Sequence, residues 1–394
     1  MKVIFIGSYP PRKCGIATFT YDLRKAVSNA ADSGDFKVIA MNNVNGGYDY
    51  SLEVIYEIQQ NDLWDYKCAS DFINSSDADI VCLQHEFGLF GGDAGRYLTT
   101  LLNNVKKPIV TSLHTVIKEP SKAYKKSTEE LISYSDKLIV MSKMGKGILK
   151  EVYKVPDEKI ELIYHGVPNI PFIDPGYYKK QLDIKGRFMI LTFGLLHPGK
   201  GIEVMIDCLP TVVKKYPNLA YIILGATHPQ VKKIHGEKYR HTLEQRVLDL
   251  GLEDNVIFHD RFVGLKELCR YICASDIYVS PYLSKEQIVS GALSYAIGMG
   301  KAIISTPYWY AKEMLSDDRG LLVDFGDFKG LSQALLFLMD NPKKCNHMRR
   351  RAYKFGRQMT WDEVGRSYNE LFEQVIRGHN TYGTDEQWKE LVAP

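Results

Sequence analysis

Short apolar runs alternate with helical patterns along almost the whole chain, and this alternation constrains the fold more than any other feature. Strands that alternate with helices form parallel sheets covered on both faces, so the pattern predicts the α/β class. The runs expected to be strands are residues 2–7, 36–41, 79–84, 108–115, 137–142 and 159–167, then 189–194, 220–225, 256–263, 276–282, 302–305 and 320–326.

The alternation is interrupted at residues 168–186, which are rich in proline and glycine and read as a linker. A chain of 394 residues can form two domains. We predict α/β domains over 1–170 and 186–358, with their sheets facing each other across a cleft. Helices are expected to close the chain, the last over 361–377. The polar stretch 53–76 is expected to be helical in its second half, and the tail from Gly378 to be loose.

The composition is that of a globular protein without a strong charge bias. Hydrophobic residues make up 45% of the chain, and 50 Lys and Arg nearly balance 47 Asp and Glu. That balance does not point to nucleic acid or an anionic membrane. Seven cysteines without a CxxC pair, and no stretch with the length of a membrane span or signal peptide, favour a cytoplasmic protein with reduced thiols. A peripheral membrane contact stays open.

Residues 284–305 combine a polar loop, a helix that starts near Ser290, a glycine stop and a buried strand. The backbone N–H groups at Ser290 and Gly291 would lie at the positive end of this helix, which suits a phosphate. An ordinary α/β crossover explains this stretch alone equally well.

A second stretch that could bind phosphate follows the first strand of the same half of the chain. It is FGLLHPGKG at 193–201. The strand ends at Gly194, and Lys200 stands just before a helix that starts at Gly201. A lysine beside free N–H groups would neutralise a diphosphate. Lys200 could also be a solvated turn residue, but its pairing with Ser290 favours the binding role.

Polar residues also follow strands of the first half, where open parallel sheets bind ligands. Gly15 precedes a helix and would let the backbone approach a ligand. His114 ends a strand and, as a neutral imidazole, could bond a substrate hydroxyl. Gln84, His85 and Glu86 suit sugar hydroxyls, and the carboxylate could act as a base. Each also has an ordinary structural explanation.

Two nucleotide-binding signatures are missing from the sequence. No GxGxxG follows either first strand, and no GxxxxGK[ST] loop occurs. A nicotinamide-dependent oxidoreductase is therefore disfavoured.

Over roughly residues 1–378 the chain resembles the family-4 retaining glycosyltransferases of the GT-B fold. The resemblance rests on Gly15, on His114, on HGV at 165–167, on FG…KG at 194–201 and on the region 280–307. It implies two Rossmann-like domains, a nucleotide sugar held mainly by the second domain and an acceptor at the first. It also implies that the last helix crosses back to the first domain.

Several residues of the family pattern are replaced in this chain. Leu195 and Leu196 stand where the family usually has an arginine, which makes Arg261 the candidate replacement. Gln287 and Tyr295 stand where the family has two glutamates. Gln287 can still bond the donor sugar, but a tyrosine cannot chelate the ribose diol as a carboxylate does. These departures indicate a divergent branch.

The activity implied by the resemblance is hexosyl transfer, with retention, from a nucleoside-diphosphate sugar to a hydroxyl acceptor. A phosphate oxygen would take the acceptor proton, so neither a metal nor a cofactor is expected. GDP-mannose is the expected donor. The residues expected to be catalytic are His114, Lys200 and Gln287. Diphosphate binding is expected of Gly194, Lys200, Arg261, Ser290 and Gly291, donor-sugar contacts of His114 and Gln287, a ribose contact of Tyr295, and acceptor contacts of Gly15, Gln84, His85 and Glu86.

Two alternatives on the same scaffold stay open. The missing glutamates favour a non-catalytic protein that binds a nucleotide sugar or a carbohydrate. The other is a sugar phosphorylase or an epimerase; the phosphorylase usually carries a pyridoxal-phosphate lysine, a role in which Lys200 or Lys301 could be imagined. In an enzyme, the cleft is expected to close on the donor with hinges at 168–186 and 355–361.

Overall fold

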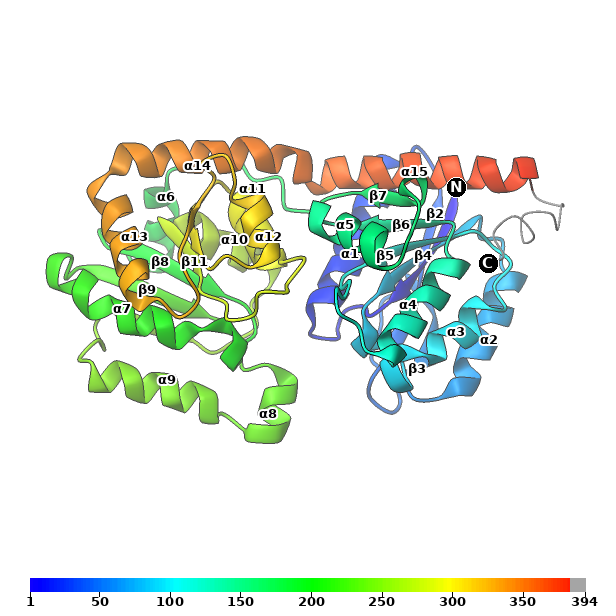
Figure 1. Cartoon of the computed structure of the whole chain (residues 1–394), viewed down its shortest axis with the longest axis horizontal. Coiled ribbons are helices and arrows are strands. Elements are labelled where there is room, and N and C mark those ends of the chain that lie inside the picture. The colour runs from blue at the N-terminus through cyan, green and yellow to red at the C-terminus, as the bar shows by residue number, and fades with distance from the viewer. Residues whose placement is uncertain (383–394) are drawn as a thin grey trace. The chain divides into compact units, whose positions relative to one another are not determined.

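The computed structural model describes residues 1–382 and divides the chain into two units. The N-terminal unit contains Met1–Gly166 together with the chain from Trp361 onward, and the C-terminal unit contains Val167–Thr360. Each unit is built around its own parallel sheet flanked by helices (Figure 1). The predicted α/β class is confirmed.

The N-terminal unit has a seven-stranded parallel sheet in the order β3-β2-β1-β4-β5-β6-β7. Its strands are β1 (Lys2–Gly7), β2 (Asp35–Asn42), β3 (Val54–Gln59), β4 (Ile80–His85), β5 (Ile109–Leu113), β6 (Lys137–Val140) and β7 (Ile160–Leu162). Its helices are α1 (Gly15–Ala30), α2 (Leu63–Ser75), α3 (Tyr97–Leu102), α4 (Lys122–Tyr134), α5 (Lys143–Val152) and α15 (Trp361–Tyr382).

The C-terminal unit has a six-stranded parallel sheet in the order β10-β9-β8-β11-β12-β13. Its strands are β8 (Phe188–Phe193), β9 (Leu219–Leu224), β10 (Val256–His259), β11 (Ile277–Ser280), β12 (Ala302–Ser305) and β13 (Leu321–Leu322). Its helices are α6 (Pro175–Lys179), α7 (Ile202–Lys215), α8 (Pro229–His235), α9 (Lys238–Asp249), α10 (Leu265–Ala274), α11 (Gly291–Gly298), α12 (Trp309–Met314), α13 (Phe328–Asp340) and α14 (Pro342–Gly356).

In both sheets the first strand lies inside the sheet, and the strand order reverses beside it. The reversal falls between β1 and β4 in the N-terminal unit and between β8 and β11 in the C-terminal unit. Ligands of open α/β sheets bind beyond the carboxyl ends of the strands at such a switch point. The strand order therefore marks one candidate site in each unit.

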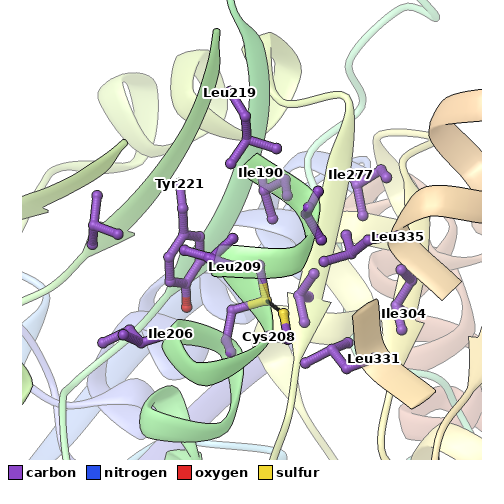
Figure 2. Close-up of a cluster of buried hydrophobic side chains, with 14 of the residues drawn as sticks. Ile190, Ile206, Cys208, Leu209, Leu219, Tyr221, Ile277, Ile304, Leu331 and Leu335 are labelled. Carbon is purple, nitrogen blue, oxygen red and sulfur yellow. Dashed lines mark hydrogen bonds between the residues drawn. The ribbon is translucent and has the colours of Figure 1, made fainter. Parts of the chain in front are cut away.

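The core of the C-terminal unit shows why its strands are nearly continuous apolar runs. Residues of β8, β9, β11 and β12 meet one side of α7 and α13, and Figure 2 shows Ile206, Leu209, Leu331 and Leu335 among them. A parallel strand is covered on both faces, so its side chains need not alternate between apolar and polar.

Helix α15 packs against α1 of the N-terminal unit at a point of very close approach. A Cβ at Gly365 would overlap the carbonyl group of Ala26. Nearby, Asn369 Nδ2 donates a hydrogen bond to Val27 O at 3.0 Å, and the Tyr368 and Ser112 hydroxyls lie 2.8 Å apart. A residue without a side chain is thus needed where the two helices cross.

The structure corrects several expected elements. Strand β3 lies within 53–76, where no strand was predicted, and two of its six residues, Ile55 and Glu57, are exposed because it is at the sheet edge. The proline- and glycine-rich residues 168–186 include α6, which packs against α10. Helix α15 continues beyond Gly378 to Tyr382, and the rest of the expected loose tail lies outside the described residues.

Replacing Gly365 with alanine should destabilise the N-terminal unit, because the added methyl group overlaps the Ala26 carbonyl group. Overpacking of this kind costs about 1–3 kcal/mol. The control is Gly378→Ala in the same helix, where a Cβ meets no atom within 4 Å. Alanine favours a helix over glycine by up to about 1 kcal/mol, so the control should be neutral or stabilising. Equal melting temperatures for the two variants would contradict this account of the helix crossing.

Candidate active site

The carboxyl ends of β8 and β11 are joined by direct packing between the loops that follow them. Gly194 comes directly after β8, and Gly201 caps α7 with a φ of 62°. A Cβ at Gly201 would overlap the carbonyl oxygen of Pro281, which follows β11. Leu283 N also donates a hydrogen bond to Gly199 O at 3.0 Å. The lysine-bearing turn is therefore fixed against the loop that leads to α11.

Lys200 lies at this junction with its side chain half-buried. Its ammonium donates a hydrogen bond to the Tyr282 hydroxyl at 2.6 Å and lies 4.0 Å from the centre of the Tyr282 ring. The same nitrogen would be 3.5 Å from a Cβ at Gly194. A positive charge is thus held beside the half-buried backbone of Gly194 at the switch point.

Helix α11 begins in the same loop region. The Ser290 hydroxyl accepts a hydrogen bond from Leu293 N at 3.3 Å, which caps the helix as expected from the sequence. The first-turn N–H groups, which include that of Gly291, have no partner within the helix, and the helix dipole makes this end attractive to an anion.

Tyr282, which stacks on Tyr308, connects Lys200 with Ser290, and the sequence analysis missed both tyrosines. The rings of Tyr282 and Tyr308 are 5.3 Å apart and inclined by only 17°. Burial raises the pKa of the Tyr282 phenol, but the charge and hydrogen bond of Lys200, with further bonds including one to Ser290, outweigh burial and lower it. Tyr282 is the last residue of the strand predicted over 276–282, a position at the carboxyl end of a strand that could have drawn attention to it.

Two histidines near Lys200, His197 and His228, were also missed. The rings of His197 and His228 are 6.1 Å apart. Burial, the Lys200 charge and His228 lower the pKa of His197 to about 4, and burial and Lys200 lower the pKa of His228. Both imidazoles are therefore neutral at pH 7, and they add hydrogen-bonding groups without charge.

Gln287, Tyr295 and Arg261 are the other residues predicted for the donor side. No hydrogen bond joins Gln287 or Arg261 to Lys200 in the part of the chain that the structure describes. Gln287 Nε2 donates to Val289 O at 2.9 Å, and Tyr295 is buried within α11. Arg261 follows β10, which is separated from β8 by β9, and its exposed guanidinium pairs with Glu267. The donor-binding roles of these three residues stay predictions.

The N-terminal unit places His114 and Gln84 in contact at the ends of β5 and β4. His114 Nε2 lies 3.1 Å from Gln84 Oε1, and because an amide oxygen only accepts, Nε2 carries the proton. Gln84 Nε2 donates to Cys82 Sγ at 3.3 Å and to Ser112 Oγ at 3.4 Å. The amide therefore selects one tautomer of the histidine and leaves Nδ1 as an acceptor.

His85 and Glu86 continue this strand end. His85 stacks on Phe90 with rings 5.8 Å apart, and its Nδ1 is buried without a hydrogen-bond partner. Glu86 accepts a hydrogen bond from Thr115 Oγ1 at 2.6 Å, and burial raises the pKa of its carboxyl group despite that bond. A carboxyl group with a raised pKa is suited to proton exchange with a substrate hydroxyl.

Gly15 opens α1 at the end of the loop that follows β1. It is exposed, and a Cβ there would meet no atom within 4 Å. Packing within the protein therefore does not require glycine at this position, which leaves the space above it open to a ligand.

The HGV segment at 165–167 has a structural explanation that the sequence alone did not supply. Phe19 packs edge-on against His114, His165 and Trp361, with ring centres 4.8–5.3 Å apart. A Cβ at Gly166 would overlap the Trp361 ring. The segment therefore anchors the start of α15 beside the His114 site.

Models of two glycosyltransferase families match the two halves of the chain. The model of Glycosyltransferase Family 4 matches residues 15–169, and the model of Glycosyl transferases group 1 matches residues 177–355. Together with the fold, these matches define a GT-B glycosyltransferase.

The chain is also similar to named proteins over much of its length. It is 25% identical to an uncharacterised glycosyltransferase of Methanocaldococcus jannaschii, over 95% of this chain and 98% of the relative. It is 24% identical to the phosphatidyl-myo-inositol mannosyltransferase of Mycolicibacterium smegmatis, over 48% of this chain and 46% of the relative. The crystal structure of Anabaena HepE with UDP and glucose matches with a TM-score of 0.74 at 16% identity, over 95% of this chain and all of HepE.

The chain belongs to the family-4, group 1 glycosyltransferases: it is a retaining hexosyltransferase that uses a nucleotide sugar. All seven cysteines lie in the described part of the chain and are free thiols. None of the helices within residues 1–382 has the length and apolar character needed to cross a membrane.

Three histidines of the N-terminal unit, the buried His85 and His114 and the half-buried His165, make acid destabilisation a testable prediction. Burial lowers the pKa of His85 and His114 to about 3 and that of His165 to about 4, against an unfolded value of about 6.5. As pH falls from 6.5 to 4, the unfolded chain binds protons that the folded chain does not. Stability should therefore fall by up to about 1.4 kcal/mol per pH unit for each histidine.

Urea unfolding at pH 7, 6 and 5 would measure this loss. The variant His85→Phe keeps the contacts with the Phe87 and Phe90 rings and removes one titrating group, so its stability should depend less steeply on pH. An unfolding midpoint that does not change with pH would show that the histidines are not held neutral by burial.

Proposed function

We propose that this enzyme transfers a hexosyl group, with mannose from GDP-mannose as the first expectation, to a hydroxyl group of a carbohydrate or other acceptor. The observation that carries the proposal is the ammonium of Lys200, held at the switch point of the sheet and linked through Tyr282 to the region where α11 begins. The C-terminal unit would bind the donor, and the N-terminal unit would bind the acceptor.

The chemistry needs stabilisation of the departing diphosphate. As the bond from the anomeric carbon to the phosphate oxygen breaks, negative charge grows on the diphosphate and positive charge on the sugar. Lys200 and the N–H groups at Ser290–Gly291 would stabilise the diphosphate with groups already fixed in place. A phosphate oxygen would take the proton of the attacking hydroxyl, so that no base from the protein is required on that face.

The acceptor side would use the polar groups at the ends of β4 and β5. The Glu86 carboxyl group offers hydrogen bonds suited to the hydroxyls of the acceptor, while the neutral His114 imidazole would contact the donor sugar. The exposed backbone at Gly15 leaves room for the acceptor to approach α1.

Two observations bear on the donor. A relative that matches 48% of this chain is a phosphatidyl-myo-inositol mannosyltransferase, which supports a mannosyl donor. The HepE structure contains UDP and glucose, which supports a uridine nucleotide. Gln287 and Tyr295 add no negative charge, which distinguishes this site from the carboxylate pair expected for the family.

A thermal-shift screen with GDP-mannose, UDP-glucose, ADP-glucose and the free nucleotides would identify the donor. A ligand at about 100 times its Kd stabilises the protein by roughly 2.7 kcal/mol, which is readily measured. We expect the largest shift with GDP-mannose. A larger shift with UDP-glucose or ADP-glucose would replace GDP-mannose as the expected donor. Binding without donor hydrolysis or transfer would favour a non-catalytic protein, the alternative that Gln287 and Tyr295 support.

Lys200→Ala should lower turnover of the donor identified in this way by about 100-fold to 1000-fold, the usual effect of removing a group that stabilises transition-state charge. The matched control is Lys214→Ala, which removes an exposed lysine on α7. Release of the nucleoside diphosphate measures turnover. Near-normal turnover in Lys200→Ala would refute the phosphate role of Lys200.

A further inference from the structure

Leu195 and Leu196 stand where the resemblance to the family implies an arginine, which leaves Lys200 as the charged side chain of the turn after β8. A lysine side chain loses up to about 2 kcal/mol of rotamer entropy when it is fixed. A partner that orients the ammonium before the ligand arrives removes this cost from binding. A carboxylate partner would cancel the charge that the diphosphate needs.

Tyr282 is a partner that carries no charge while its phenol is protonated. A phenol in that form accepts a hydrogen bond, and the nearby Lys200 charge, acting against burial, lowers the pKa of this group from its ordinary value. Its oxygen lies 2.6 Å from Lys200 Nζ, and the ammonium is 4.0 Å from the ring centre, within the range of a cation–π contact. The hydrogen bond therefore restricts the direction of the lysine side chain, and the cation–π contact restricts the distance of its ammonium from the ring.

The ring itself is held firmly. Tyr282 is only 2% exposed and stacks on Tyr308, which is fully buried. Its carbonyl oxygen accepts a hydrogen bond from Thr306 Oγ1 at 2.6 Å. Because the phenol is fixed in place, its contacts with Lys200 limit the conformations that the flexible lysine side chain adopts.

We propose that Tyr282 is a positioning residue that orients the Lys200 ammonium toward the diphosphate of the donor and so replaces part of the function of the missing arginine. The proposal rests on the proposed diphosphate site. Tyr282 acts through Lys200, so removing its hydroxyl should matter only while the lysine is present.

A double-mutant cycle tests this dependence. The dissociation constants of UDP and GDP, and of uridine and guanosine, would be measured by calorimetry for wild type, Tyr282→Phe, Lys200→Ala and the double variant. Phenylalanine keeps the stack on Tyr308 and removes only the hydroxyl. The matched control is Tyr221→Phe, which removes a buried phenol of the same unit that bonds Thr192 Oγ1 at 3.0 Å.

We expect Tyr282→Phe to weaken binding of the preferred diphosphate by roughly tenfold, the usual size for a hydrogen bond to a charged group. Nucleoside binding should not change, and neither should diphosphate binding by Tyr221→Phe. The double variant should bind the diphosphate as Lys200→Ala does, within about twofold. A structural defect would instead weaken nucleoside and diphosphate binding together.

The outcomes separate the two levels of the proposal. Wild-type affinity in Tyr282→Phe, or independent losses that multiply in the double variant, would overturn the positioning role and leave the diphosphate site standing. Wild-type affinity in Lys200→Ala, or failure of the wild type to bind either diphosphate, would overturn the diphosphate site and the role of Tyr282 with it.

Discussion

The close approach of two loops at the β8–β11 switch point is the constraint on which the candidate donor site depends. The left-handed Gly201 allows the turn after β8 to pack directly on the Pro281 carbonyl group. That contact brings Lys200 to Tyr282, although the two residues are 82 positions apart. The arrangement fixes a charge beside a helix start before any ligand binds, which is the condition for electrostatic stabilisation without reorganisation.

The switch point of the N-terminal unit differs in its chemistry. It contains buried polar groups, and the described residues there include no fixed charge comparable to Lys200. Gln84 bonds His114, Ser112 and Cys82 at once, so the imidazole has one tautomer and one orientation. Edge-on packing of Phe19 against that ring adds a second restraint. The unit thus presents neutral hydrogen-bonding groups in fixed orientations, which is what the proposed acceptor site requires.

Much of the fold could be predicted from the sequence because its strands are buried on both faces and its helices are amphipathic. The exception is β3, whose edge position leaves Ile55 and Glu57 exposed and blurs its pattern. Positions such as Lys200 and Ser290 were predicted because glycine, lysine and cap residues at strand–helix junctions have a local physical meaning. Tyr282 was missed because a tyrosine at a strand end looks like an ordinary core residue.

By itself, the sequence determined the class of the fold, the start of α11 at Ser290 and the lysine that precedes α7, since each follows from local backbone and side-chain preferences. The tertiary structure alone decided the strand order, the pairing of Lys200 with Tyr282 and the contact of Gln84 with His114. These depend on which strand ends become neighbours. That choice is made by the packing of whole helices and sheets, and no local sequence pattern encodes it.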